Sequence, residues 1–85
     1  MSDPKTWVYV LRSQSATSRY YTGLSSNWRA RLDAHNDGAC HHTAKYRPWD
    51  VDVLIQFADQ RRAAAFECYL KSGSGCAFAK QHLRV

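Results

Sequence analysis

The chain contains a single glutamate, Glu67, and this carboxylate is the clearest candidate for a metal ligand. On a helix it would lie about 40–60° from Ala63 and Leu70, at the rim of the apolar stripe that they form. One carboxylate at the edge of a groove suits Mg²⁺ or Mn²⁺, which take hard oxygen ligands. The alternative is a structural ion pair with Lys71, four residues later, which would stabilise the helix by only about 0.2–0.5 kcal/mol.

Arg31 and His35 lie one helical turn apart and share the i, i+3, i+4, i+7 pattern of Trp28 and Leu32. A guanidinium at this position could clamp a phosphate and stabilise the charge that develops during phosphoryl transfer. The alternative is that Arg31 lies along the apolar stripe and keeps only its charged end in water. The pattern fits both interpretations.

Two tyrosines, Tyr9 and Tyr21, belong to neighbouring segments with the character of paired strands. Buried strand tyrosines are commonly core residues whose hydroxyl is hydrogen-bonded. A phenol beside Arg, Lys or a metal ion can instead lose its proton more readily and act as a general base. The pair is therefore either structural or a proton-transfer device.

The segment Lys45-Tyr46-Arg47-Pro48-Trp49 interleaves cations with aromatic rings. This combination suits phosphate contacts together with base stacking on single-stranded nucleic acid. The alternative is a rigid basic turn with Trp49 packed beneath it. Nearby, His35 and the run Cys40-His41-His42 match no standard zinc spacing, and consecutive side chains do not easily converge on one tetrahedral ion. We therefore expect no structural zinc.

Hydrophobic patterning indicates the strands that must position these side chains. Residues 7–11 are apolar on both faces, which suits a central strand, and residues 20–24 follow a polar loop as its hairpin partner. Gly23 inside the second strand indicates a bulge or a close backbone approach. A half-buried third strand is expected over 51–57, where apolar and polar residues alternate.

The helices follow from capping residues and breakers. The first is expected between a cap in 25–27 and a stop at Gly38, and residues 37–49 are expected to form a loop. The second should run from a cap at Asp59 to about residue 71. The next four residues, Ser-Gly-Ser-Gly, should break this helix, and a short last helix is expected near 76–83. The order ββαβαα predicts one small α+β domain over residues 1–85, with a three-stranded, mainly antiparallel sheet flanked by helices.

The balance of 12 Lys+Arg against 7 Asp+Glu gives a net charge of +5. This favours a polyanionic partner, because cations at phosphates release condensed counterions. Three cysteines without a CxxC pair argue against a disulfide framework and for a reducing compartment, and Cys68 is expected in the core. The apolar run 7–11 is too short to span a membrane, so we expect a cytoplasmic protein without a membrane contact. Nothing in the sequence indicates a protein partner.

The order of these segments resembles the GIY-YIG nuclease family, in particular its single-domain bacterial members. Trp7-Val8-Tyr9 stands at the position of the first family tripeptide, and Tyr21-Thr22-Gly23 at that of the second. Residues 29–36 match the first family helix with its arginine and histidine. Residues 42–49 match the loop before the third strand, and 65–73 match the metal-ligand helix. The resemblance covers nearly the whole chain.

The chain departs from the family pattern at several positions. Trp7 replaces the glycine of the first tripeptide, and Thr22 replaces the isoleucine of the second. No asparagine follows Asn36, so the C-terminal asparagine of many members has no counterpart. Cys76 stands where small relatives often have a basic residue, which affects substrate binding. The catalytic residues of the family are retained as Tyr9, Tyr21, Arg31 and Glu67.

The resemblance implies a metal-dependent endonuclease that hydrolyses DNA phosphodiester bonds and leaves 5′-phosphate and 3′-hydroxyl ends. One Mg²⁺ or Mn²⁺, held by Glu67 and waters, would bind the scissile phosphate. Tyr9 would take a proton from the attacking water, assisted by Tyr21, with His42 or Lys45 as further candidates.

The resemblance also assigns Arg31 to the charge on phosphorus, with His35 hydrogen-bonding nearby. A small groove flanked by Trp28, Tyr46 and Trp49 would favour single-stranded or structured DNA over intact duplex. The alternative function is a non-catalytic domain that binds nucleic acid or a partner and retains the nuclease fold. The residues expected to bind nucleic acid or support the site are Gly23, Trp28, His42, Lys45, Tyr46, Arg47, Trp49 and Lys71.

Overall fold

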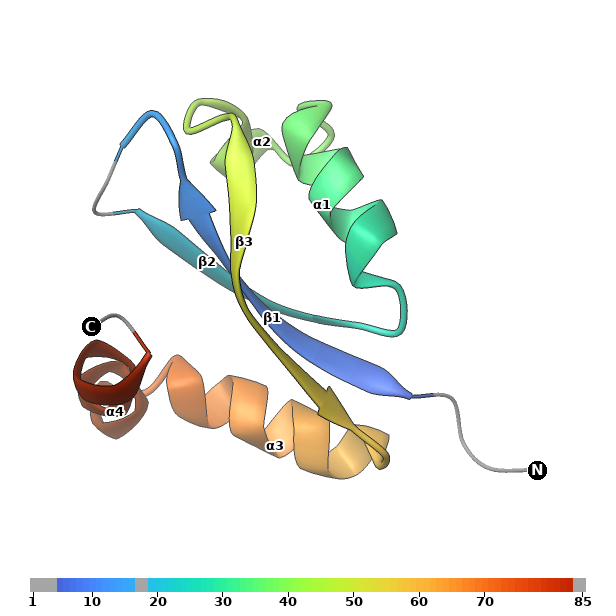
Figure 1. Cartoon of the computed structure of the whole chain (residues 1–85), viewed down its shortest axis with the longest axis vertical. Coiled ribbons are helices and arrows are strands. Elements are labelled where there is room, and N and C mark those ends of the chain that lie inside the picture. The colour runs from blue at the N-terminus through green and yellow to red at the C-terminus, as the bar shows by residue number, and fades with distance from the viewer. Residues whose placement is uncertain (1–4, 17–18, 84–85) are drawn as a thin grey trace.

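Three strands form one antiparallel sheet in the computed structural model, which describes residues 5–16 and 19–83. They are β1 (Thr6–Ser13), β2 (Tyr20–Ser25) and β3 (Trp49–Phe57), in the order β2-β1-β3 across the sheet (Figure 1). Both neighbours of β1 run antiparallel to it. The expected three-stranded sheet is confirmed, and the strand that is apolar on both faces is the central one.

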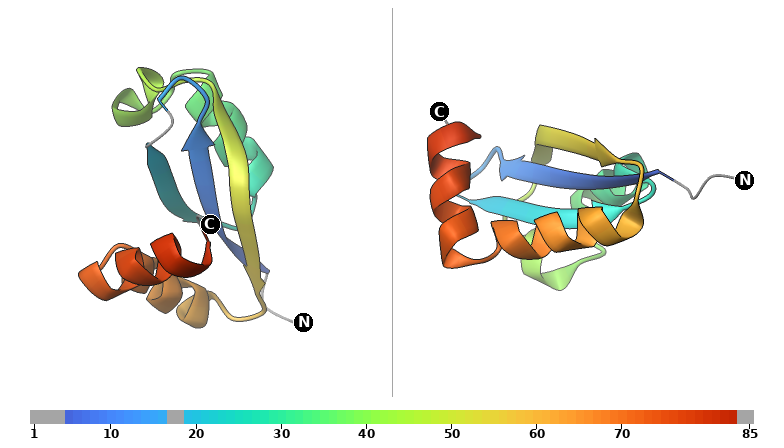
Figure 2. Two further views of the ribbon diagram at one scale, coloured as in Figure 1. Left: turned by 60° about the vertical axis from the view of Figure 1, so that its left-hand side comes forward. Right: turned by 90° about the horizontal axis from the view of Figure 1, so that it is seen from below.

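Helices cover both faces of this sheet. Helix α1 (Trp28–Asn36) lies on one face, and α3 (Gln60–Leu70) and α4 (Gly73–His82) lie on the other (Figure 2). The expected order ββαβαα of the main elements is confirmed. The segment 37–49, predicted as a loop, differs in detail: it contains a single helical turn, α2 (His41–Ala44), and its last residue already belongs to β3.

The central strand contributes to two separate hydrophobic clusters. Val8 and Val10 pack against α3 and α4, whereas Tyr9 and Leu11 pack toward α1 and the start of β3. Successive side chains of a strand point to opposite faces, so a fully apolar strand can be buried on both. Tyr9 therefore lies on the α1 side of the sheet.

Asparagine side chains define both ends of α1. Of the candidate caps it is Asn27 that begins the helix, and its side-chain oxygen accepts the Ala30 N–H at 3.1 Å. Gly38 follows the helix at φ +82°, a conformation that favours glycine. Asn36 accepts the Trp49 N–H at 2.6 Å and donates to the Trp49 carbonyl at 3.0 Å. The end of α1 is thus tied to the first residue of β3.

The junction of α3 and α4 corrects one expectation. Asp59 caps α3 as predicted, but α4 begins at Gly73 rather than near residue 76. The expected break is present, because α3 ends at Leu70 and Lys71 and Ser72 lie outside both helices. The last three residues of the Ser-Gly-Ser-Gly stretch nevertheless belong to α4, which Ser72 caps by accepting the Gly75 N–H at 3.1 Å. A side chain on Gly75 would overlap the Tyr69 carbonyl, so this glycine lets α4 pack closely on α3. Gly75 therefore has a packing role at the start of α4.

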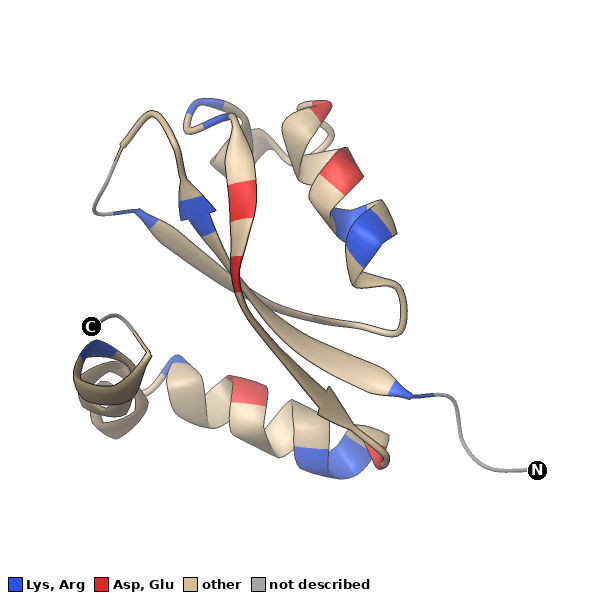
Figure 3. Ribbon diagram, viewed as in Figure 1, with Lys and Arg blue, Asp and Glu red and all other residues tan. Residues whose placement is uncertain are grey.

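Charged residues are distributed over the whole molecule. Figure 3 shows Lys and Arg on helices and loops on both sides of the sheet, so a positively charged face must be assembled from several elements. Cys68, expected in the core, is exposed, because its position on α3 faces away from the sheet. None of the described helices is long and apolar enough to cross a membrane.

Candidate active site

Gly23 allows the two candidate tyrosines to lie together. Tyr9 on β1 is paired with Gly23 on β2, and a β-carbon on Gly23 would overlap the end of the Tyr9 ring and its hydroxyl. The ring, which is 1% exposed, therefore lies across the β2 backbone. Of the two roles expected for this glycine, the structure supports the close approach. Tyr21 lies two residues earlier on β2, and its ring centroid is 6.2 Å from that of Tyr9.

His35 joins the tyrosines from α1. Its ring centroid lies 4.5 Å from that of Tyr21 and 6.4 Å from that of Tyr9. The residue is 1% exposed, and its Nδ1 lies 2.8 Å from the Thr43 hydroxyl oxygen. Burial lowers the pKa of His35, and the nearby Arg31 charge lowers it further. The imidazole is therefore neutral at pH 7.

Arg31 contributes the positive charge of this group. It is solvent-exposed, and its guanidinium donates a hydrogen bond to the Tyr9 hydroxyl, which raises the pKa of Arg31. Burial raises the pKa of Tyr9, and the Arg31 hydrogen bond lowers it by a smaller amount. Tyr9 is therefore a protonated phenol at neutral pH, held beside a cation that would stabilise its anion.

Glu67 on α3 forms an ion pair with Lys71, and the Oε1 and Nζ atoms are 2.5 Å apart. This contact raises the pKa of Lys71. Glu67 is only 14% exposed, whereas Lys71 is 58% exposed. The Lys71 charge also acts on Tyr9 and Tyr21, so the α3 pair belongs to the same site. The structural alternative predicted for Glu67 is thus present, next to the other candidate residues.

The donor atoms at Glu67 suit a weakly held, hydrated divalent ion. Its Oε1 is shielded from solvent and faces the Lys71 ammonium group. Within residues 5–16 and 19–83, no group of three or more His, Cys, Asp or Glu side chains could hold a metal ion. A single carboxylate fits Mg²⁺ or Mn²⁺, which keep several waters and bind substrate phosphates. A protein-only metal cage does not fit.

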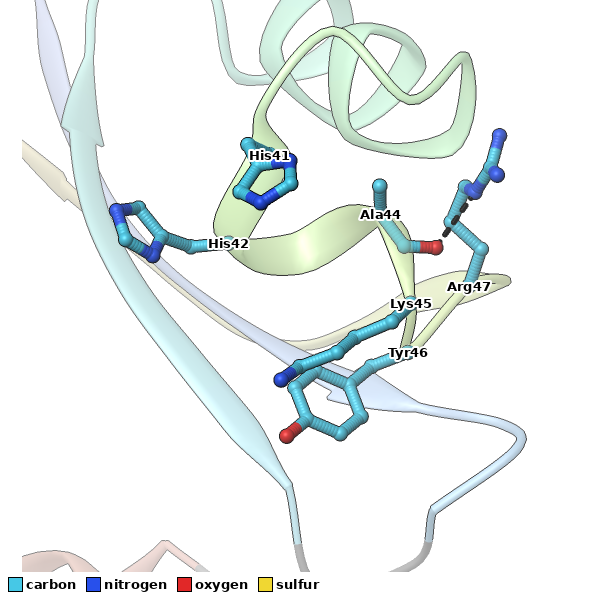
Figure 4. Close-up of a pocket in the computed structure, with 6 residues that line it drawn as sticks. All are labelled: His41, His42, Ala44, Lys45, Tyr46 and Arg47. Carbon is cyan, nitrogen blue, oxygen red and sulfur yellow. Dashed lines mark hydrogen bonds between the residues drawn. The ribbon is translucent and has the colours of Figure 1, made fainter.

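The basic loop after α2 lines an open pocket of about 670 Å³ (Figure 4). The Tyr46 ring lies between two cations: the Lys45 Nζ is 5.2 Å and the Arg19 Cζ 4.8 Å from its centroid. Arg47 turns back on its own loop, and its Nε donates to the Ala44 carbonyl at 2.7 Å. Lys45 and Tyr46 are therefore better placed than Arg47 to meet a ligand.

His42 connects this loop to the tyrosine cluster. It also lines a second pocket of about 130 Å³, together with Tyr21, Tyr46 and Arg19. The basic loop and the catalytic candidates consequently share one continuous surface. His42 and Tyr21 both border this smaller pocket, so the expected assistance of His42 is compatible with its position.

The two candidate tryptophans are less accessible than expected. Trp49 is 4% exposed, and its Nε1–H donates to the Thr43 carbonyl at 2.9 Å. Its ring cannot stack on a base, and the alternative of a turn with Trp49 packed beneath it is the observed arrangement. Trp28 is half-buried beside Leu32, with the Arg29 guanidinium 5.2 Å from its ring. Both residues belong to the hydrophobic cluster that packs around Tyr9.

Sequence reasoning missed two polar residues of the site. Thr43, which binds His35, lay in a segment predicted as loop, and no local pattern indicated its partner. Arg19 stacks on Tyr46 but follows a polar loop 27 residues earlier in the sequence. Both contacts join segments that are distant in sequence.

Residues 5–76 match the GIY-YIG catalytic domain family, so the match includes all the strands, α1 to α3 and every candidate residue. The chain belongs to the GIY-YIG family. This GIY-YIG domain is 32% identical over 85 residues to the structure-specific endonuclease subunit SLX1 of Debaryomyces hansenii, an alignment that covers 92% of this chain and 25% of that protein. The chain thus spans about a quarter of the relative's length.

Proposed function

We propose that this GIY-YIG domain is a metal-dependent endonuclease that hydrolyses DNA phosphodiester bonds. The observation that supports this most directly is that two phenols, a neutral imidazole and an exposed guanidinium lie together at one place in the fold. These groups come from β1, β2 and α1 and have no shared structural need to converge. They are Tyr9, Tyr21, His35 and Arg31.

In the proposed reaction, Arg31 binds a non-bridging oxygen of the scissile phosphate and stabilises the charge that develops there. Tyr9 takes a proton from the attacking water. As the neutral phenol it must first lose its own proton, which the positive charges of Arg31 and Lys71 favour, since both lower its pKa. The water oxygen bonds to phosphorus as the bond to the 3′-oxygen breaks, and the leaving oxygen takes a proton from solvent, which leaves 5′-phosphate and 3′-hydroxyl ends.

We propose that Glu67 holds one Mg²⁺ or Mn²⁺ with waters completing the coordination. When bound, the ion supplies a Lewis acid that neutralises phosphate charge. Lys71 occupies the carboxylate at 2.5 Å, so it has to move aside for the ion. Its side chain is 58% exposed, which leaves it free to move into solvent.

For the substrate, we propose single-stranded or structured DNA. The relative SLX1 is named a structure-specific endonuclease subunit, and this chain matches about a quarter of it. The Tyr46 ring, which has two cations near it, could stack on an unpaired base. Lys45 and Arg19 could then contact the phosphate backbone of the DNA. The pocket of about 130 Å³ beside Tyr21 adds aromatic surface for a displaced base.

A second candidate function is supported by the Glu67–Lys71 ion pair. A carboxylate neutralised by its own helix has a structural role, and the same fold could then bind DNA or a partner without cutting it. The convergence of the tyrosines with Arg31 and His35 argues for the enzyme.

A cleavage panel separates the two functions. Single strands, duplexes, flaps and branched substrates would be incubated at one salt concentration with Mg²⁺, Mn²⁺ or EDTA. The expected result is metal-dependent cutting that is lost in Glu67→Ala and in Arg31→Ala while DNA binding and thermal stability persist. Asp33→Ala and Arg62→Ala, at exposed positions, are matched charge controls.

Binding without cleavage across the whole panel would support the non-catalytic function. Cutting of plain duplex as fast as of flaps or single strands would refute the substrate preference alone.

A further inference from the structure

Thr43 makes a buried side-chain contact with His35. It is buried on α2, and its Oγ1 lies 2.8 Å from His35 Nδ1. The same hydroxyl donates to the Cys40 carbonyl oxygen at 3.3 Å. On the other side of the ring, His35 Nε2 is buried and has no hydrogen-bond partner among the described residues.

Counting protons assigns the tautomer of His35. A threonine hydroxyl has one proton, and the Cys40 carbonyl oxygen lies within hydrogen-bonding distance to accept it. Oγ1 can then only accept from His35, so the ring proton must be on Nδ1. In the opposite tautomer the hydroxyl proton would go to Nδ1, and Nε2–H would be a buried donor without an acceptor. Buried N–H groups without partners are rarer and costlier than unpaired acceptors.

We propose that Thr43 is a positioning residue that holds His35 as the Nδ1–H tautomer and so presents Nε2 as an unprotonated hydrogen-bond acceptor beside the two active-site tyrosines. The partner of one imidazole nitrogen decides which nitrogen carries the proton. The Tyr21 ring centroid lies 4.5 Å from that of the imidazole, so this acceptor belongs to the ring that packs on the active-site tyrosine. Burial keeps the ring neutral, which preserves the free lone pair.

The contact also joins the loop to the active site. Thr43 precedes the basic loop, and its carbonyl accepts the Trp49 indole N–H at 2.9 Å. One residue thereby connects His35 on α1, the basic loop and the first residue of β3. The catalytic consequence of this inference rests on the proposed function, whereas the tautomer itself does not.

The test is a long-range ¹H–¹⁵N correlation spectrum of the ¹⁵N-labelled chain at neutral pH. Wild type should show His35 Nδ1 as the protonated and Nε2 as the unprotonated nitrogen. Thr43→Val keeps the shape but removes the acceptor, so the spectrum should shift toward the Nε2–H tautomer. Thr43→Ser keeps the hydroxyl and should restore the wild-type pattern. The exposed His41 and His42 signals, unchanged in all three, are the internal control.

Kinetics provide the second readout. Because positioned proton transfer contributes about 10²- to 10⁴-fold to a rate, Thr43→Val should lower kcat by at least about tenfold, with KM for DNA changed by less than about threefold. Thr43→Ser should recover most of kcat. An Nε2–H signal in wild type, or an unchanged tautomer in Thr43→Val, would overturn the proposal. If no variant cleaves DNA but the spectra behave as stated, the proposed function fails and the tautomer assignment stands.

Discussion

Replacing Gly23 by alanine is expected to displace the Tyr9 ring and to damage both stability and cleavage. The added β-carbon would overlap the Tyr9 ring carbon and hydroxyl, so the buried ring would have to shift into its packed surroundings. Overpacking of this kind costs about 1–3 kcal/mol of unfolding free energy. In a domain of this size, each kcal/mol lowers Tm by about 4–8 °C.

The catalytic loss should exceed the loss of stability. Arg31 donates to the same Tyr9 hydroxyl, so a shifted ring also changes the position of the guanidinium. A displacement of about 1 Å in a catalytic group can cost on the order of 100-fold in rate. Single-turnover cleavage at a temperature well below Tm would measure this loss on folded protein, and urea unfolding would measure the stability.

Gly73→Ala is the matched control, because a β-carbon there meets nothing within 4 Å. It should leave the cleavage rate unchanged and keep or slightly raise stability. A double variant, Gly23→Ala with Tyr9→Leu, should recover part of the lost stability through a coupling of about 0.5–3 kcal/mol, without recovering cleavage. A Gly23→Ala protein that melts and cuts DNA like wild type would refute the close approach of Tyr9 to β2.

Three further outcomes are expected. Burial lowers the pKa of His35, so on acidification the unfolded chain takes up a proton that the folded chain does not. Wild type should therefore lose stability relative to His35→Asn as pH falls below about 6.5. Urea unfolding from pH 7.5 to 5 checks this. Trp49→Phe removes a buried hydrogen bond and should cost about 1–3 kcal/mol of stability with little change in DNA affinity. Tyr46→Ala should instead weaken DNA binding with little change in stability. Thermal melts and binding titrations measure both. Lys71→Gln frees the Glu67 carboxylate and should lower the Mg²⁺ concentration for half-maximal cleavage; an unchanged or higher concentration would contradict the competition.

Local patterns predicted the elements because each depends on neighbouring residues. The apolar run of β1 and the alternation of β3 are strand signals within single segments. Asn27 and Asp59 cap helices through backbone groups two or three residues away. The start of α4 was predicted three residues too late, because the close packing of Gly75 on the Tyr69 carbonyl joins two helices and is not a local pattern.

The candidate site residues also divide into those that the sequence predicted and those whose surroundings depend on contacts between elements. The resemblance to GIY-YIG nucleases placed Tyr9, Tyr21 and Arg31 in one site, and the structure brings these three together. The accessibility of Trp49 could not be predicted from its neighbours. Its ring turns inward because Asn36 and the α2 carbonyl hold it there.

The sequence by itself determined the strands, the main helices and the family, because these are carried by residue type and order along the chain. The tertiary structure decided between the alternatives for Glu67, which forms the ion pair with Lys71. It alone showed that the Tyr9 ring packs against Gly23 and that Thr43 binds His35. The last two contacts join segments eight or more residues apart. They depend on how α1, α2 and the sheet pack in space, which no pattern within a single segment encodes.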